Sequence, residues 1–234
     1  MRISIITLFP EVFEPILNTS ILKRAQKKGK VEFELINLRD FGEGKHQVVD
    51  GRPYGGGAGM VLRADILATA LKSIISKLPT TNYQLLTIVT SASGRPYKQQ
   101  KARELSKLDH LILVCGHYEG VDQRFIDKYV DEEISIGDYV LTGGEIPAMV
   151  IVDSITRLIP SVLEKPEAVI NESFTENFLE GPQYTRPEKF ERKKVPSVLL
   201  SGNHQEIKKW REKESISKTK KVRPDLLKIT TQKD

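Results

Sequence analysis

The chain of 234 residues contains a single cysteine, Cys115, and a single tryptophan, Trp210. One cysteine excludes an internal disulfide and a cysteine-rich zinc site, and this usage fits a reducing cytoplasm, where we expect the protein to reside. Because Cys115 ends an apolar run that starts at Leu111, we expect its thiol to be buried and poorly ionised. A cysteine nucleophile is therefore not expected.

Long hydrophobic runs are also missing. No stretch reaches the roughly 18 apolar residues that a transmembrane helix needs, and the best candidate, residues 146–159, is interrupted by Asp153 and Arg157. The sequence thus predicts no membrane-spanning helix. The apolar residues 3–9 are followed by two glutamates and no small-residue cleavage site, so we interpret them as a buried strand rather than a secretion signal.

Several catalytic motifs are absent as well. The four histidines, at positions 46, 110, 117 and 204, include no pair at i, i+4 and no His-Glu-x-x-His, so the sequence predicts no metal site built by the protein alone. No Gly-x-Ser-x-Gly elbow occurs. The glycine-rich residues 51–59 lack the Gly-Lys-Ser/Thr ending of a nucleoside-triphosphate loop. These absences argue against nucleophilic hydrolysis and nucleoside-triphosphate chemistry.

Charge is unevenly distributed along the chain. The whole chain has 36 Lys and Arg against 31 Asp and Glu, for a formal net charge of +5. From residue 185 to the end there are 15 Lys and Arg against 7 Asp and Glu, so the residues before that point are acidic in sum. A basic end of this kind is either a solvated surface or a binding surface for a polyanion.

The surroundings of Trp210 favour the polyanion. Lys208, Lys209 and Arg211 flank the ring, and an aromatic ring among cations can stack on a base while the cations hold phosphates. Trp210 also follows Ile207 at helical spacing, and for the ring itself this spacing favours a place in the core. The basic end is therefore a candidate nucleic-acid surface whose tryptophan need not touch the nucleic acid.

Strand-like and helix-like segments alternate over residues 1–160. We expect strands at residues 3–9, 31–38, 85–90 and 111–115, and helices at residues 15–28, 64–77, 98–108 and 147–158. This alternation predicts an α/β domain with a largely parallel sheet. Because the strands are apolar almost throughout, helices should cover both faces of the sheet.

The remaining residues predict a linker and a second domain. Residues 161–184 are rich in proline and show little periodicity, which predicts an interdomain linker. Residues 185–234 predict a small helical, basic domain. Asn203, with Glu206 three residues later, predicts a capped helix that runs to about Lys213, and the Pro-Asp pair at 224–225 can open another.

Glycine-containing loops give the strongest indication of a binding site. Residues 51–59 contain five glycines near the charged and aromatic side chains of Asp50, Arg52 and Tyr54. Three more such loops, at residues 91–95, 116–120 and 136–144, follow apolar segments. Ligands of open α/β sheets bind beyond the carboxyl ends of the strands. We therefore expect these loops to form a pocket built mainly from backbone.

Residues 40–44 offer a competing cofactor loop. Their sequence, Asp-Phe-Gly-Glu-Gly, is similar to the glycine loop of Rossmann-type methyltransferases and dehydrogenases, but it lacks the third glycine and no helical pattern follows. We interpret the segment as a turn. A class I methyltransferase that would use this segment is therefore disfavoured.

Four strings of the chain closely resemble the bacterial tRNA (guanine-N1)-methyltransferases of the SPOUT class: Asp50–Met60, Leu113–Asp122, Ser135–Glu145 and Leu199–His204. The resemblance runs from residue 1 to about residue 228. It implies an α/β domain with a deep trefoil knot, a homodimer, and S-adenosylmethionine bound in a bent form at the dimer interface. It also implies methyl transfer to N1 of the guanine immediately 3′ of the anticodon in tRNA, and magnesium dependence, which no residue pattern here indicates directly.

The resemblance also assigns binding residues, position by position. It implies cofactor contacts, made largely through backbone, at Val89, Thr90, Ser91, Gly94, Gly116, Tyr118, Glu119, Gly120, Ile136, Gly137, Tyr139, Leu141, Gly143, Gly144 and Pro147. On the guanine and tRNA side, the expected residues are Asp50, Arg52, Tyr54, Gly55, Gly56, Gly57, Gly59, Arg186, Asn203, His204, Lys208, Lys209 and Arg211.

The chemistry of this reaction indicates which side chains to seek, and the resemblance places them at two further positions. Guanine N1 carries a proton and is a poor nucleophile until that proton leaves, so a carboxylate base is needed, with a cation near O6 to stabilise the developing charge. Arg157 matches the family's arginine. Where the family has an aspartate before Ser-Phe, this chain has Glu172, and no aspartate occurs between Asp153 and Asp225. We expect Glu172 to be the base.

A non-enzymatic RNA-binding module, whose glycine loops hold a nucleotide regulator, is the alternative function. The presence of Arg157 together with a carboxylate at position 172 favours the enzyme. Donor binding followed by a test for methyl transfer to tRNA separates the two.

Overall fold

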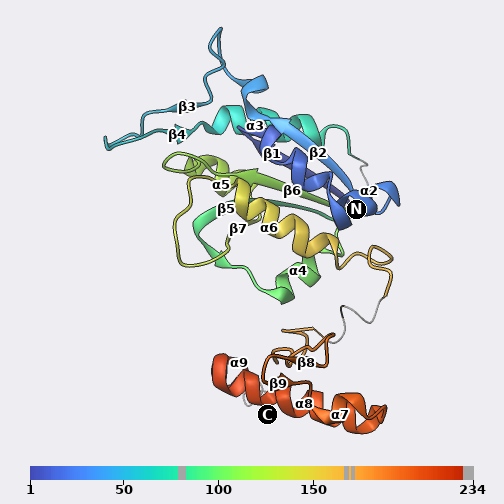
Figure 1. Ribbon diagram of the computed structural model, residues 1–234. Helices are drawn as coiled ribbons and strands as arrows, with labels where there is room; N and C mark the ends of the chain where they lie inside the picture. The colour runs from blue at the N-terminus through green and yellow to red at the C-terminus, as the bar shows by residue number, and fades with distance from the viewer. Residues whose placement is uncertain (79–82, 166–168, 170–171, 229–234) are drawn as a thin grey trace. The chain divides into compact units, whose positions relative to one another are not determined.

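The computed structural model describes residues 1–78, 83–165, 169 and 172–228, in two compact units, Met1–Glu164 and Lys165–Asp234 (Figure 1). The remaining parts of the predicted linker and of the predicted basic domain, residues 166–168, 170–171 and 229–234, lie outside the described residues.

A five-stranded sheet, parallel throughout, forms the centre of the first unit. Its strand order is β2-β1-β6-β5-β7. The strands are β1 (Arg2–Thr7), β2 (Glu32–Asn37), β5 (Leu85–Pro96), β6 (His110–Cys115) and β7 (Glu132–Ser135). The parallel α/β fold expected from the sequence is confirmed, and residues 3–7 are buried within it as a strand. The strand β7 was not predicted.

Helices follow the strands along the chain. They are α1 (Glu14–Leu17), α2 (Ser20–Lys27), α3 (Ala64–Ile75), α4 (Gln99–Leu105), α5 (Gln123–Tyr129) and α6 (Glu145–Thr156), with short 3-10 helices η1 (Pro10–Val12) and η2 (Leu38–Phe41). The prediction of one helix over residues 15–28 was wrong. The chain leaves the helical conformation at Asn18 and Thr19, where Asn18 Nδ2 donates to Glu14 O (2.9 Å) and the Thr19 hydroxyl donates to Pro15 O. Such side-chain bonds to the backbone compete with helix propagation.

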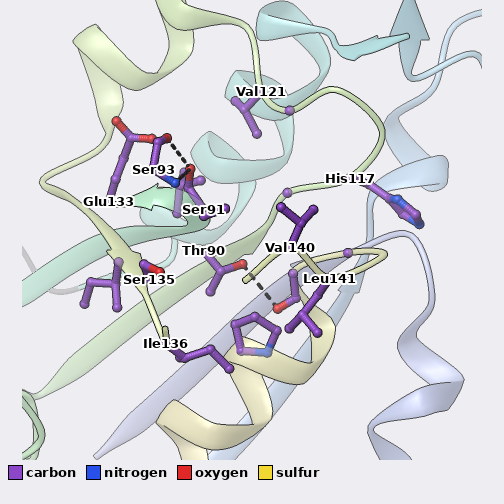
Figure 2. Close-up of a pocket in the computed structure, with 18 of the residues that line it drawn as sticks. Thr90, Ser91, Ser93, His117, Val121, Glu133, Ser135, Ile136, Val140 and Leu141 are labelled. Carbon is purple, nitrogen blue, oxygen red and sulfur yellow. Dashed lines mark hydrogen bonds between the residues drawn. The ribbon is translucent and has the colours of Figure 1, made fainter. Parts of the chain in front are cut away.

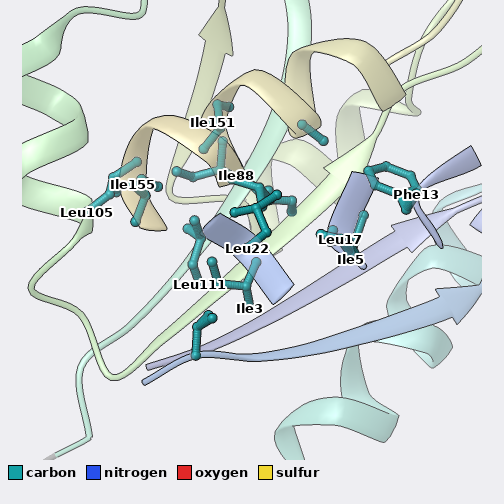
Figure 3. Packing of buried hydrophobic residues seen from close by; sticks show 14 of the residues in the cluster. Ile3, Ile5, Phe13, Leu17, Leu22, Ile88, Leu105, Leu111, Ile151 and Ile155 are labelled. Carbon is teal, nitrogen blue, oxygen red and sulfur yellow. The ribbon is translucent and has the colours of Figure 1, made fainter. Parts of the chain in front are cut away.

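Two hydrophobic clusters lie on opposite faces of the sheet. Leu111 and Leu113 of β6 belong to the cluster that includes α1, α2, α4 and α6 (Figure 3), whereas Ile112 and Val114 belong to the cluster that includes α3 and α5. Successive side chains of a strand point to opposite faces, so the fully buried β6 contributes to both. This three-layer arrangement explains why the strands are apolar almost throughout.

The segment after β2 forms a turn, as expected. Residues 38–41 are the helix η2, and Glu43 and Val48 then exchange two backbone hydrogen bonds of 3.0 Å each. Beyond the turn, β3 (Asp50–Gly51) and β4 (Val61–Leu62) pair as an antiparallel hairpin.

A buried histidine begins β6 at the amino-terminal edge of the sheet. His110 is fully buried, and its Nε2 lies 2.9 Å from Ser4 Oγ. Because the Ser4 hydroxyl donates to Glu34 Oε2 (2.8 Å), we assign Nε2 as the donor to Ser4. Nδ1 is buried without a hydrogen-bond partner. Burial, and secondarily the charge of Arg2, lower the pKa of His110 to about 4.

This histidine predicts a loss of stability in acid. Its folded-state pKa lies below the ordinary value of 6.5, so the unfolded chain binds the proton first as the pH falls. The contribution of neutral His110 to the free energy of unfolding is fully present above about pH 6.5. It decreases toward pH 4 by about 1.4 kcal/mol per pH unit, and by about 3 kcal/mol in all. Urea unfolding of wild type and His110→Gln between pH 7.5 and 4.5 measures it. A variant that loses as much stability as wild type would contradict the assignment.

The second unit contains a short hairpin and three helices within the described residues. These elements are β8 (Lys189–Phe190), β9 (Lys193–Lys194), α7 (Ser197–Leu200), α8 (His204–Val222) and α9 (Pro224–Lys228). The predicted cap is confirmed, because Asn203 Oδ1 accepts from Gln205 N (3.2 Å) and Glu206 N (3.3 Å). The helix α8 extends past the predicted end at Lys213 to Val222, since the first helix-breaking residue after it is Pro224.

Residues 179–184 lie against α8. Leu179 N donates to Thr219 Oγ1 (2.8 Å), and Ser215 Oγ donates to Leu179 O (2.6 Å). The ring of Trp210 is partly buried and lies 6.2 Å from that of Tyr184, centroid to centroid. Across the described parts of both units, no helix has the length and apolar character needed to cross a bilayer.

Candidate functional site

A pocket opens where β5, β6 and β7 end at their carboxyl edges (Figure 2). Its volume of about 360 Å³ is within the range of pockets that enclose small molecules. Three chain segments build it: residues 89–93 within β5, residues 116–121 after β6, and residues 133–147 from β7 to the start of α6. The expectation of a loop at residues 91–95 was wrong, because β5 continues to Pro96 through its pairing with β7. Parallel strands bring their following loops to one edge, as the sequence led us to expect.

Gly144 joins the loops. Its N donates to Gly116 O (2.7 Å), and its carbonyl accepts from Thr90 Oγ1 (3.2 Å; Figure 2). A Cβ at this position would lie 2.6 Å from Gly116 N and 2.8 Å from the Cα of Cys115. Only glycine lets the residues before α6 pack this closely against the ends of β5 and β6.

The predicted cofactor residues gather here. All except Gly94 line the pocket. Gly94 instead lies in the β5–β7 pairing, where a Cβ would be 2.6 Å from the backbone of Glu133 and Ile134. Its glycine is required for that pairing, which shifts register between Thr90 and Arg95.

Sequence reasoning missed the contributions of α5 and β7. Ile126 of α5 and Glu133 of β7 line the pocket, but neither element was predicted. Two short signals for these elements were available in the sequence. They are the apolar pair Phe125 and Ile126 of α5, and the pair Ile134 and Ser135 before the third glycine loop. They were weak because charged residues surround them.

The ionisable side chains of the pocket are mainly acidic. Among its lining residues are Glu119 and Glu133, and none is lysine or arginine. His117 also lines it; its Nδ1 accepts from Tyr118 N (3.0 Å), and its ring stacks on that of Tyr118 with centroids 4.9 Å apart. A ligand that carries positive charge is favoured in these surroundings.

The glycine-rich hairpin is bonded to the pocket. Glu119 N donates to Met60 O and Leu62 N to Gly120 O, both at 2.9 Å. A Cβ on Gly59 would overlap the Glu119 carboxylate, so this carboxylate lies directly against the hairpin. The hairpin carries all the predicted guanine-side residues between positions 50 and 59, with positive φ at each glycine from 55 to 59, and Tyr54 is 97% exposed.

The two predicted catalytic residues belong to different units. Arg157 follows α6 in the first unit and is partly buried. Glu172 is partly buried in the second unit, in a turn where Thr175 N donates to Glu172 O (3.2 Å). Asn171, which precedes it in the family-like motif, lies outside the described residues.

The predicted tRNA residues of the second unit are mostly on α8. Lys208 pairs with Glu212 (3.9 Å) and Lys209 with Glu206 (3.1 Å), on exposed side chains. Such surface pairs contribute little free energy, so they leave both ammonium groups open to phosphates. Arg186 and His204 are exposed, and Asn203 Oδ1 is used by the helix cap.

The Cys115 thiol and the possible metal ligands bear on the chemistry of the chain. Cys115 is buried, and burial raises the pKa of its thiol well above the usual range, with the charge of Glu145 as a second cause. A cysteine nucleophile is thereby disfavoured. In the described part of the chain, no three His, Cys, Asp or Glu side chains are grouped so as to hold a metal ion.

Comparison with known proteins gives one consistent result. The family described as tRNA (Guanine-1)-methyltransferase TrmD matches residues 1–229. A protein of Dictyoglomus turgidum is 52% identical over 236 aligned positions, which cover 100% of this chain and 94% of that protein. Proteins of Geobacillus kaustophilus (52% identical; 97% and 91% covered) and Clostridioides difficile (50%; both chains covered fully) are similar. All three are named tRNA (guanine-N(1)-)-methyltransferase, and this chain belongs to that family.

Proposed function

We propose that this chain methylates N1 of the guanine immediately 3′ of the anticodon in tRNA, with S-adenosylmethionine as the methyl donor. The observation that carries the proposal is the pocket at the carboxyl ends of β5, β6 and β7, in a chain of this family. The glycine hairpin, which we assign to the guanine side, is bonded directly to it through Glu119 and Gly120.

The residues of the pocket fit S-adenosylmethionine. The donor carries a sulfonium and an ammonium, and the lining offers Glu119 and Glu133 with no lysine or arginine. Close backbone approach is possible because Gly116, Gly120 and Gly144 have no side chains. When bound, the donor supplies an electrophilic methyl group.

The chain's own residues then have defined tasks. Glu172 accepts the proton of guanine N1, and Arg157 stabilises the negative charge that develops at O6. Neither task needs a nucleophilic side chain, in agreement with the buried, poorly ionised Cys115.

We assign the fold its family features too, a deep trefoil knot and a homodimer. The close packing of Gly144 between the ends of β5 and β6 supports a chain crossing at this point. Ile146 and Val150, one turn apart on α6, are 52% and 42% exposed. Apolar side chains exposed on one helix face beside the pocket support a subunit contact there.

The direct test uses purified protein and an unmodified transcript of tRNA. We expect saturable binding of S-adenosylmethionine, followed by formation of 1-methylguanosine at the target position, measured by mass spectrometry of nuclease digests. A transcript with adenine at that position is the matched control and should remain unmethylated. Binding of tRNA and donor without methyl transfer would support the non-enzymatic alternative instead.

The second unit should provide much of the attraction to tRNA. We expect reversal of charge at Lys208, Lys209 and Arg211 to weaken tRNA binding and to reduce the slope of log Kd against log salt by about three. Each phosphate contact that is lost means that about one counterion fewer is released from the tRNA on binding. Binding of S-adenosylmethionine, measured by calorimetry, should not change. An unchanged salt slope would assign these residues to a solvated surface.

A further inference from the structure

We infer that a second groove in the first unit, formed by the hairpin β3–β4 with α3 and α5, binds the sugar-phosphate backbone of the tRNA. This inference rests on the proposed function, since it takes tRNA as the substrate. The groove adjoins the pocket, because Val121 lines both. The hairpin extends outward beyond α3 (Figure 1).

The size of the groove suits a polymer. Its volume is about 1310 Å³, above the upper limit of about 1,000 Å³ for pockets that enclose small ligands. A groove that is wide, open and continuous with a pocket can hold a strand whose target base enters that pocket.

Its charge suits a polyanion. Five cations line the groove, Arg52, Arg63, Lys72, Arg124 and Lys128, against two carboxylates. The carboxylates are already neutralised, because Arg63 pairs with Asp65 and Arg124 with Asp122, each at 2.7 Å. Among the described residues, Arg52, Lys72 and Lys128 form no ion pair with a carboxylate, in a part of the chain that is acidic in sum. Localised positive charge of this kind attracts phosphates.

Tyr129 lies next to two of these cations. Lys72 Nζ of α3 lies 5.8 Å from the centroid of its ring, and Lys128 Nζ of α5 lies 5.4 Å from it. A cation over a ring keeps its N–H donors available. The two ammonium groups bring positive charge from α3 and α5 to the same part of the groove, where it attracts phosphates.

An exposed aromatic side chain distinguishes RNA from an acidic peptide as the occupant. Tyr54, at the tip of the hairpin, lines the same groove and is 97% exposed. An exposed ring next to uncompensated cations can stack on an unpaired base while the cations hold the adjoining phosphates.

The test compares two charge-removing variants of the full-length protein. In K72Q/K128Q, two exposed lysines in the last turns of α3 and α5 lose their charge. The control, K23Q/K27Q, removes two exposed lysines from α2. The affinity for unmodified tRNA is measured by fluorescence anisotropy at several salt concentrations, together with donor binding, methyl transfer and mass by light scattering.

We expect K72Q/K128Q to bind tRNA about tenfold or more weakly, with a salt slope lower by about two. Donor binding should be unchanged, and K72R/K128R should restore affinity. The inference is overturned if the tRNA affinity of K72Q/K128Q matches that of the control. It is also overturned if the molar mass of the particle in solution changes, because this surface would then be a contact between copies of the chain. Failure of the proposed function is a separate result, since wild type would then bind tRNA without methylating it.

Discussion

Glu172→Gln should lose about a hundredfold or more in single-turnover methyl transfer while it still binds S-adenosylmethionine and tRNA. The amide keeps the size of the side chain but cannot accept the proton of guanine N1, so only the chemical step is affected. Glu172→Asp should keep substantial activity, because the carboxylate is retained. Quenched-flow measurement of 1-methylguanosine in tRNA at saturating enzyme gives the rates.

Two further variants complete this experiment. Glu176→Gln, which changes an exposed glutamate in the same segment, is the matched control and should transfer methyl groups at the wild-type rate. Arg157→Ala should lose a factor comparable to that of Glu172→Gln, since the charge at O6 then has no cation beside it. Near-normal transfer by Glu172→Gln would contradict the assignment of Glu172 as the base, and Asp153 and Glu180 would be the next candidates.

Gly144→Ala should abolish donor binding and lower stability by about 3 kcal/mol, the upper end of the cost of overpacking. The added methyl group would meet backbone atoms of Gly116 and Cys115, which cannot move aside as a flexible side chain could. The end of β6 and the residues after it would have to separate from the residues before α6. Chemical unfolding and calorimetric titration with S-adenosylmethionine measure the two effects.

Gly51→Ala is the control for this substitution. A Cβ at Gly51 would have no atom within 4 Å, and its φ is not in the left-handed region. It should therefore leave stability and donor binding unchanged. Wild-type donor affinity in Gly144→Ala would show that the close packing at Gly144 is not needed for the pocket.

Local sequence patterns were sufficient for most of the fold. The apolar residues of β1, β2, β5 and β6 and the periodic residues of α3, α4 and α6 predicted a parallel α/β unit. They failed for β7, whose charged residues depend on partners far along the chain, as Glu132 does on Lys101 of α4 (2.8 Å). They also failed at Asn18 and Thr19, where side-chain bonds to the backbone end a helix that periodicity alone would continue.

The candidate site divides in the same way. Glycine loops after apolar segments were enough to expect a backbone-lined pocket, because the edge of a parallel sheet collects such loops. The reason Gly144 must be glycine is a contact with Cys115 and Gly116, nearly thirty positions earlier, which no local pattern contains. Glu172 and Arg157 came only from the family resemblance, since no spacing or periodicity in the chain marks them.

The bonds between the hairpin and the loop after β6 have a thermodynamic consequence. Glu119 N of the loop donates to the hairpin, and Leu62 N of the hairpin donates to the loop. A ligand that orders the loop therefore also restricts the hairpin. Linkage makes the effect reciprocal: whatever factor the donor contributes to the affinity for RNA, RNA must contribute to the affinity for the donor. The spent cofactor, which lacks the methyl group and the sulfonium charge, would hold the loop less strongly, and methyl transfer would thereby loosen the enzyme's hold on its own product.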